Sequence, residues 1–131
     1  MKKLTITHPK FGWFDGTYEL LMSQFHPNES DPINEGVSVV IDFKNNTGKT
    51  IKYAIFIFDG YNAVGDLAVE ANGQSYTGPV LPGKINRNLI LHNLWFSRQI
   101  SLVRFGCCNL IYMDGTEELL YEDDVELVSK I

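Results

Sequence analysis

Cysteine is scarce in this sequence. The chain of 131 residues has two, Cys107 and Cys108, which are adjacent. Neighbouring residues of a strand point to opposite faces, so the pair cannot supply the bridge between sheets that antibody domains use. A disulfide between neighbours is strained, and two thiols fall short of a zinc site. We therefore expect one buried and one partly exposed thiol, with a redox or metal role as the alternative.

Catalytic motifs are also missing. The sequence has no GxSxG elbow, no phosphate-binding loop and no dinucleotide fingerprint. The three histidines, none in a metal-binding spacing, are His8, His26 and His92. We expect His26 to be solvated and His92 to be a hydrogen-bonded structural residue, a catalytic base being the alternative. The acids Asp114, Glu117 and Glu118 follow a predicted turn, which does not hold two carboxylates across a cleft. The sequence predicts no enzyme, cofactor or metal.

Long hydrophobic runs are absent as well. No apolar stretch approaches the 18 residues of a membrane span. Met1-Lys2-Lys3 resembles the start of a signal peptide, but polar residues from Thr5 to Lys10 interrupt the apolar region, and no small-residue cleavage site follows. The chain as given is expected to be cytoplasmic, or to be a trimmed segment of an extracellular protein.

The charge is negative and uneven. A net charge of −5 opposes nucleic-acid binding, which requires a basic face. Residues 71–113 contain no acid, whereas residues 114–126 contain seven acids and no base. One interpretation is neighbouring strands with complementary outer faces. The other is a patch for a protein partner or for self-association, which includes Glu122, Asp123 and Asp124.

What the sequence does contain is strand signals. Val37, Val39, Ile41 and Phe43 alternate with other residues, residues 45–49 form a Gly/Asn break, and a second β-rich run spans residues 50–58. This pattern predicts a hairpin. Both faces of residues 51–58 are apolar, so this strand is expected to be central in a sandwich or covered by a partner.

Further short strands separated by turn residues fill the rest of the chain. They are expected at residues 3–7, 10–14, 17–25, 67–70, 86–95, 99–105, 108–113 and 116–121, with a bulge at Gly106. Turns are expected at Asp15-Gly16, Asn72-Gly73, Thr77-Gly78-Pro79, Pro82-Gly83 and Asp114-Gly115, the last as a type I′ hairpin. Residues 122–131 read as a frayed strand or a short helix. The sequence predicts one all-β domain over residues 1–131, an immunoglobulin-like two-sheet antiparallel sandwich, with a small open barrel as the alternative.

Four strings occur in a fixed order: NTGKTIKY at 46–53, YNAVGD at 61–66, TGP at 77–79 and YMDGT at 112–116. Together they make residues 37–120 similar to a group of small bacterial immunoglobulin-like β-sandwich domains of unassigned function. The resemblance implies the fold and carries no catalytic residues. Residues 1–36 lie outside it and would add strands and a loop.

Two clusters of side chains allow a functional interpretation. Asp59, Asn62 and Asp66 are expected to close turns, calcium binding being the alternative, although the spacing is not that of an EF-hand. Five aromatic residues lie near turns or strand ends and could stack on a sugar: Trp13, Phe14, Tyr76, Trp95 and Phe96. The competing interpretation makes Trp95 the core tryptophan and lets Trp13 and Phe14 seal one end of the core.

The function predicted from these features is a non-catalytic interaction or assembly module. It would dock on another protein or on itself through an edge strand or the acidic segment. The alternative is a module that binds a small ligand, either carbohydrate or calcium. An enzyme would require a pocket that joins His92 or His26 to a carboxylate.

Overall fold

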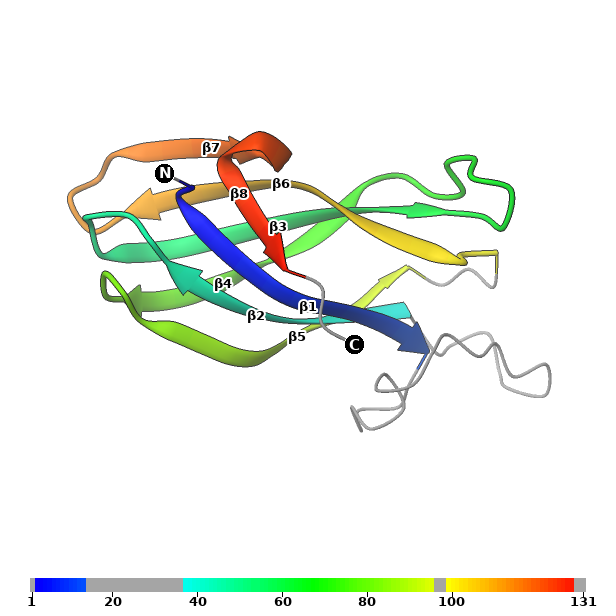
Figure 1. Cartoon of the computed structure of the whole chain (residues 1–131), viewed down its shortest axis with the longest axis horizontal. Helices are drawn as coiled ribbons and strands as arrows, with labels where there is room; N and C mark the ends of the chain where they lie inside the picture. Colours follow the sequence, from blue (N-terminus) through cyan, green and yellow to red (C-terminus); the bar gives the residue numbers. More distant parts are fainter. Residues whose placement is uncertain (1, 14–36, 96–98, 129–131) are drawn as a thin grey trace.

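Strands make up most of the structure. The structure is a computed structural model that describes residues 2–13, 37–95 and 99–128; the side chains of residues 8–13 and of Asn88, His92 and Asn93 are not described. Figure 1 shows the strands, most of them along the long axis of the molecule and the first and last of them oblique to it. They are β1 (Leu4–Trp13), β2 (Val37–Asn45), β3 (Ile51–Tyr61), β4 (Asn72–Val80), β5 (Ile85–Trp95), β6 (Leu102–Tyr112), β7 (Glu117–Tyr121) and β8 (Val125–Val128).

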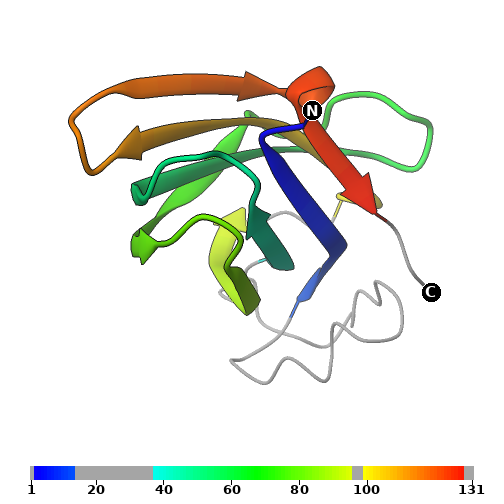
Figure 2. The ribbon, with the colours of Figure 1, turned by 60° about the vertical axis from the view of Figure 1, so that its left-hand side comes forward.

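The strands form two four-stranded sheets that pack face to face (Figure 2). The first sheet has the order β5-β2-β1-β8 and the second the order β4-β3-β6-β7. All pairs are antiparallel except β1 with β8, which is parallel. The order of the strands corresponds to that of an immunoglobulin domain. In the first sheet, β1, β2 and β5 occupy the positions of strands A, B and E. In the second sheet, β3, β6 and β7 occupy the positions of strands C, F and G. The predicted all-β two-sheet sandwich is confirmed.

The predicted hairpin between residues 37–45 and 50–58 is wrong, because β2 and β3 belong to different sheets. The Gly/Asn segment between them is an arch that crosses from one sheet to the other. The buried side chain of Asn45 holds the arch: its Nδ2 donates to the carbonyls of Lys49 and Val80, both at 2.9 Å. Its Oδ1 accepts the backbone N–H of Thr47 at 2.9 Å. One buried side-chain amide thus provides hydrogen bonds to backbone groups that would be paired with a neighbouring strand in a hairpin.

Two of the predicted turns are also wrong. Asn72-Gly73 and Thr77-Gly78-Pro79 lie inside strand β4. A Cβ at Gly73 would stand 1.7 Å from the carbonyl oxygen of Phe56, and one at Gly78 would stand 2.4 Å from that of Ile51. These glycines therefore allow β4 to approach β3 closely rather than to turn. Because β4 is an edge strand, Pro79 is tolerated there.

Other turn predictions are confirmed. Gly83 has a φ of 83°, and a hydrogen bond from Lys84 N to Leu81 O closes its turn at 3.0 Å. Gly115 closes the β6–β7 hairpin with a φ of 89° and donates to Tyr112 O at 3.0 Å. Tyr112 and Thr116 close the hairpin, so its loop has three residues and ends in a left-handed glycine, rather than the two residues of the expected type I′ turn.

Several predicted pieces merge in the structure. Residues 3–7 and 10–14 were predicted as separate strands, and β1 runs through both as far as Trp13, with a register shift between Thr7 and Lys10. Residues 99–105 and 108–113 contribute to the single strand β6, in which Gly106 is the extra residue opposite Ile57 and Phe58, as predicted for a bulge. The predicted strand at residues 17–25 lies outside the described residues.

The C-terminal segment combines both predicted alternatives. A 3₁₀ turn at Glu122–Asp124 redirects the chain from the second sheet to the first, where β8 pairs with β1 (Figure 1). Leu4 pairs with Val125, and Thr7 with Val128. The backbone N–H of Lys3 also donates to the carbonyl of Asp124 at 2.8 Å.

Aromatic rings fill the space between the sheets. Phe43 of β2 meets Phe56 of β3 edge to face at 5.0 Å, and Phe58 meets Phe105 of β6 at 5.8 Å. Such pairs contribute about 0.5–1.5 kcal/mol beyond their buried area. No helix among the residues placed by the structure is long and apolar enough to cross a membrane.

Candidate interaction surface

The outer side of the second sheet is unusually apolar. Along β3, Ala54, Phe56 and Phe58 are buried in the core, so the residues between them point outward. These outward residues, Tyr53, Ile55 and Ile57, are half-buried without a covering layer among the described residues. The strand was expected to be central in a sandwich or covered by a partner. It is central in its sheet, and its outer face lacks the polar residues typical of a solvated sheet.

The neighbouring strands extend this apolar surface. Ile57 pairs with Cys107 of β6, which pairs with Tyr121 of β7. Leu119 and Tyr121 are 48% and 56% exposed, whereas Leu120 between them is 1% exposed. We call the set the apolar face. Its members are Tyr53, Ile55, Ile57, Tyr61, Leu102, Cys107, Ile111, Leu119 and Tyr121.

Charge enters the apolar face at one end. Asp59 of β3 and Arg104 of β6 are register partners in the row between Ile57–Cys107 and Tyr61–Leu102. At the opposite end, Glu117 stands beside Ile111, and its Oε1 accepts a 3.4 Å hydrogen bond from Asn109 Nδ2. The face is therefore an apolar strip with charged residues towards its ends.

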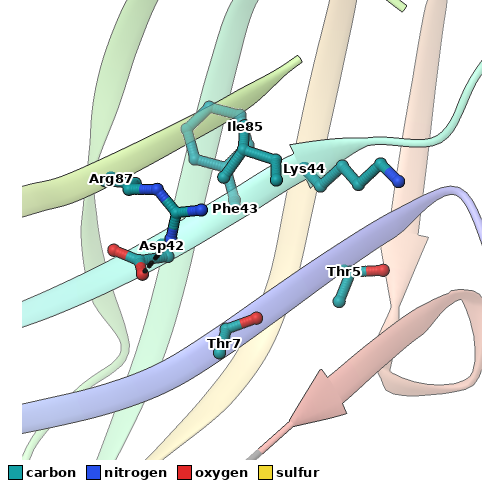
Figure 3. Close-up of a pocket in the computed structure, with 7 residues that line it drawn as sticks. All are labelled: Thr5, Thr7, Asp42, Phe43, Lys44, Ile85 and Arg87. Atoms are coloured by element: carbon teal, nitrogen blue, oxygen red, sulfur yellow. Dashed lines mark ion pairs between the residues drawn. The ribbon is translucent and has the colours of Figure 1, made fainter. Parts of the chain in front are cut away.

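The outer side of the first sheet is more polar around a groove. This shallow groove of about 270 Å³ lies across β1, β2 and β5 (Figure 3). Its lining residues are Thr5, Thr7, Asp42, Phe43, Lys44, Ile85 and Arg87. Asp42 and Arg87 form an ion pair at 3.6 Å. Thr5 Oγ1 donates to Glu126 Oε1 at 3.1 Å. Further along β2 and β5 the outer side is apolar, because Val40 and its register partner Ile90 point away from the core.

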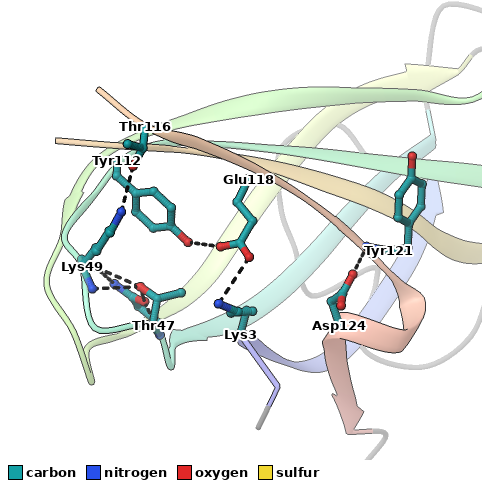
Figure 4. A network of polar contacts seen from close by, with 9 residues as sticks. Lys3, Thr47, Lys49, Tyr112, Thr116, Glu118, Tyr121 and Asp124 are labelled. Atoms are coloured by element: carbon teal, nitrogen blue, oxygen red, sulfur yellow. Dashed lines mark hydrogen bonds and ion pairs between the residues drawn. The ribbon is translucent and has the colours of Figure 1, made fainter. Parts of the chain in front are cut away.

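A polar network closes the end of the sandwich near the β6–β7 turn (Figure 4). The hydroxyl of Tyr112 donates to Glu118 Oε1 at 2.7 Å, and Lys3 pairs with Glu118 at 3.3 Å. Burial raises the pKa of Tyr112, and the carboxylate of Glu118 adds to the effect. The hydrogen bond from Tyr112 lowers the pKa of Glu118, helped by Lys3 and opposed by burial.

The same end holds the second acid–base pair. Lys49 Nζ lies 3.2 Å from Asp114 Oδ2 and donates to Thr116 Oγ1 at 3.0 Å. Hydrogen bonds from the Thr116 hydroxyl and N–H, and then Lys49, lower the pKa of Asp114 to about 2. Acids of the C-terminal region thus pair with lysines near the N-terminus and the arch.

The predicted acidic patch lies in the 3₁₀ turn. Asp124 has a structural contact, because its Oδ2 accepts the backbone N–H of Tyr121 at 3.0 Å. The side chains of Glu122 and Asp123 are exposed. The acidic patch therefore adjoins Tyr121 at the edge of the apolar face, and one of its three carboxylates shapes the turn.

The predicted aromatic cluster is divided by the structure. Trp95 is 7% exposed and donates from Nε1 to the Glu70 carbonyl at 2.6 Å, which agrees with the core interpretation. Tyr76 points inward, with its ring 5.6 Å from that of Phe43. Neither ring forms an exposed platform. The side chain of Trp13, and the whole of Phe14 and Phe96, lie outside the described residues.

Asn62 and Asp66 of the predicted Asp/Asn cluster close a turn, whereas Asp59 lies inside β3. Asn62 Oδ1 accepts the N–H groups of Val64 and Asp66 at 3.1 and 2.9 Å, and Gly65 has a φ of 87°. Within the described part of the chain, no group of three or more His, Cys, Asp or Glu residues is placed to hold a metal ion. The side chains of His8, His26 and His92 lie outside that part.

The two thiols differ as expected. Cys108 is fully buried, and Cys107 is half-buried on the apolar face; both are free. Burial raises the pKa of both thiols, and Asp59 raises that of Cys107 further. Cysteine nucleophiles have lowered pKa values, so this site does not activate a thiol.

Comparison of the chain with models of protein families, with curated proteins and with solved structures found no match. The resemblance to bacterial β-sandwich domains therefore stays a prediction. The sequence did contain a sign of the apolar face in the doubly apolar residues 51–58. It did not identify Leu102, Leu119 and Tyr121, because alternation alone does not say which side of a strand faces the core.

Proposed function

We propose that this protein is a non-catalytic interaction or assembly module that docks through the apolar face. The observation that carries the proposal is the continuous row of outward apolar side chains across β3, β6 and β7, which contrasts with the mostly polar residues around the groove of the first sheet. An exposed and contiguous apolar surface marks an interaction site in a soluble domain. Ordinary solvation does not explain Leu119 and Tyr121, which are about half exposed beside half-buried isoleucines.

The surface also has the composition of an interface. Tyrosine and isoleucine provide rigid apolar area, and charged residues stand towards the ends rather than at the centre. The β7 edge of the second sheet is short, and its exposed side chains continue the face. The acidic turn at Glu122–Asp124 adjoins this edge and would contribute selectivity for a basic partner surface at its rim.

The test is affinity capture from lysate and envelope fractions of the source organism. The baits are the native chain, a Leu102→Lys/Leu119→Lys variant of the apolar face, and an Ile85→Lys control on the other sheet. Ile85 is 45% exposed, close to the 47% of Leu102, so the control makes one such substitution at a matched exposure on the other sheet. A partner retained by the native and control baits and lost with the face variant supports the proposal. Capture that is unaffected by the face variant overturns it.

A second arm separates the acidic turn from the apolar face. Reversing the charge of Glu122 and Asp123 leaves the structural carboxylate of Asp124 in place. If docking uses the apolar face, this change should weaken capture in low salt and matter little at high salt, because rim charges are screened. Complete loss of capture at high salt would move the docking site to the acidic turn.

The groove on the first sheet favours a second candidate, binding of a small polar ligand. Its threonine hydroxyls and its residues of both charges, Asp42, Lys44 and Arg87, suit a sugar or a zwitterion better than calcium, which requires six to eight oxygen ligands. A panel of glycans and divalent ions at millimolar concentration should then raise the melting temperature of the native chain. If the same ligand raises the melting temperature of a Lys44→Ala/Arg87→Ala variant equally, the groove is not its binding site.

A further inference from the structure

We propose that the occupant of the apolar face is a second copy of this chain, bound face to face about a two-fold axis that runs along β3 and β6 and lies between them. The inference rests on the proposed function and names the partner for the same surface. It follows from the cross-strand register of the second sheet, which fixes what each residue would oppose in such a dimer.

This axis brings β3 of one copy over β6 of the other, and β4 over β7. Residues of one register row then oppose residues of the same row. The opposed pairs are Tyr53 with Ile111, Ile55 with Asn109, Ile57 with Cys107, Asp59 with Arg104, and Tyr61 with Leu102. Each contact occurs twice, as a two-fold interface requires.

Charge complementarity supports the arrangement. Asp59 and Arg104 are neighbours on adjacent strands of one chain. The proposed axis places the carboxylate of each copy over the guanidinium of the other, so four charges of alternating sign meet with no net charge. The stretch from Tyr53 to Ile57 and from Cys107 to Ile111 contributes mainly apolar contacts on both sides.

Shape complementarity supports it independently. Register partners in β4 and β7 belong to the same rows as β3 and β6. Tyr121 would oppose Gly73, and Leu119 would oppose Ser75. The two exposed apolar side chains of β7 thus meet two small residues of β4, which leaves room for a ring and an isobutyl group.

The perpendicular axis fits poorly. An axis across the strands at the middle of the face would reverse the order of its five rows and place Asp59 over Ile55 and Arg104 over Asn109. Each charge would then lose water without gaining a partner of opposite sign, which is strongly unfavourable. Asp59 and Arg104 therefore favour the axis along the strands over the axis across them.

The size of the face bounds the affinity. Four strands contribute from row Tyr53 to row Ile57, and only β3 and β6 continue to row Tyr61. With strands about 4.8 Å apart and a rise of about 3.4 Å per residue, this surface covers roughly 400 Å² per copy. Two copies would bury roughly 800 Å², below the area of about 1,000 Å² that a stable specific interface exceeds. The dimer is accordingly expected to be weak and reversible, with a mass that rises with protein concentration.

The experiment is sedimentation equilibrium on the native chain and on two charge variants, Asp59→Arg and Arg104→Asp. The native chain should exceed 14.9 kDa increasingly as its concentration rises. Each variant alone opposes like charges across the axis and should associate at least about tenfold more weakly. An equimolar mixture of the two variants opposes arginine to aspartate at every charged contact, so association should return.

Two controls make the result decisive. Unchanged melting curves show that each variant is folded, and Ile85→Lys should dimerise like the native chain. A native chain that stays a monomer at all concentrations, or a mixture that associates no better than its components, overturns the proposed dimer. If the chain is monomeric and the face variant still loses a captured partner, the dimer is ruled out and the proposed interaction function is retained. If the chain is monomeric and capture does not depend on the apolar face, both proposals are ruled out.

Discussion

Tyr112 and Glu118 meet across the β6–β7 hairpin, where the phenolic hydroxyl donates a 2.7 Å hydrogen bond to the carboxylate. Tyr112 is buried, and the Glu118 side chain is 35% exposed and also pairs with Lys3. The contact links the last residue of β6, the second residue of β7 and the segment before β1. It thereby connects the two sheets at the end of the sandwich away from the Asp59–Arg104 row.

We predict that Tyr112→Phe lowers the free energy of unfolding by roughly 1 kcal/mol at pH 7, since a hydrogen bond to a charged acceptor is lost but water partly replaces it. The folded pKa of Glu118 is lowered, so its contribution is present above its unfolded pKa, about 4.3, and is lost as pH falls through the folded pKa. The difference between the native chain and Tyr112→Phe in urea unfolding should therefore shrink towards pH 3. A difference that is constant from pH 7 to pH 3 would contradict the assignment.

Asp114 makes a separate acid-dependent contribution. Its pKa in the folded state is about 2, lowered by Thr116 and Lys49, and lies below the value of an unfolded chain, about 3.9. Its stabilising effect is therefore complete above pH 4 and declines as pH falls towards 2. We predict that Asp114→Asn melts at a lower temperature than the native chain at pH 7 and that the two melting temperatures converge near pH 2. Asp66→Asn, in the other exposed turn, is the matched control.

Gly115→Val should destabilise the protein by roughly 1–3 kcal/mol, because a β-branched residue is forced into a positive φ. Gly48→Val is the control, since Gly48 lies in another exposed loop with open space around it and without a positive φ. Denaturant unfolding of both variants checks the prediction. A loss below about 0.3 kcal/mol for Gly115→Val, or an equal loss for both, would show that the backbone at this turn is not strained by a side chain.

Gly73→Ala should be more damaging than its small volume suggests, with a loss of about 3 kcal/mol or more, because a backbone carbonyl rather than a flexible side chain must move. Gly48→Ala again serves as the control. The readout is the melting temperature together with amide exchange in β4 and β3. A melting temperature near the native value would mean that β4 lies farther from β3 than the structure places it.

The two thiols should react one after the other. We predict that a thiol reagent modifies Cys107 in the native protein and reaches Cys108 only after unfolding. The thiolate is the reactive form, so the rate at Cys107 should rise with pH, and the raised pKa moves this rise to more alkaline pH than for a free thiol. Cys107→Ser should then abolish the reaction of the native protein. Two equivalents reacting at one rate before unfolding would contradict the burial of Cys108.

Local patterns predicted the strands better than their pairing. Residues 37–45 form β2 with the predicted bounds, yet the neighbouring strand β3 belongs to the other sheet. A Gly/Asn segment between two apolar strands suits a hairpin and an arch equally, because both require polar loop residues. Asn45 favours the arch, because its buried amide donates a hydrogen bond to the carbonyl of Val80. Val80 is 35 residues further along the chain, so no local sequence pattern contains this contact.

The candidate surface was predicted in part for a similar reason. The doubly apolar β3 was visible in the sequence, as was the acidic turn. Leu119, Leu120 and Tyr121 are all apolar, and the sequence does not say that Leu120 is the one that points inward. Two glycines led to wrong turn predictions. Gly73 and Gly78 resemble turn residues in the sequence, but in the structure they allow close contact between β4 and β3.

The parallel pairing of β1 with β8 has a mechanical consequence. Force that draws the chain before Leu4 and after Val128 in opposite directions acts along these two strands and loads their register pairs in shear. Hydrogen bonds loaded in shear must break together, whereas those of a hairpin pulled from its open end break one at a time. The fold should therefore resist stretching along the chain more strongly than pulling across β6 and β7, a difference that single-molecule extension from the two pairs of attachment points would measure.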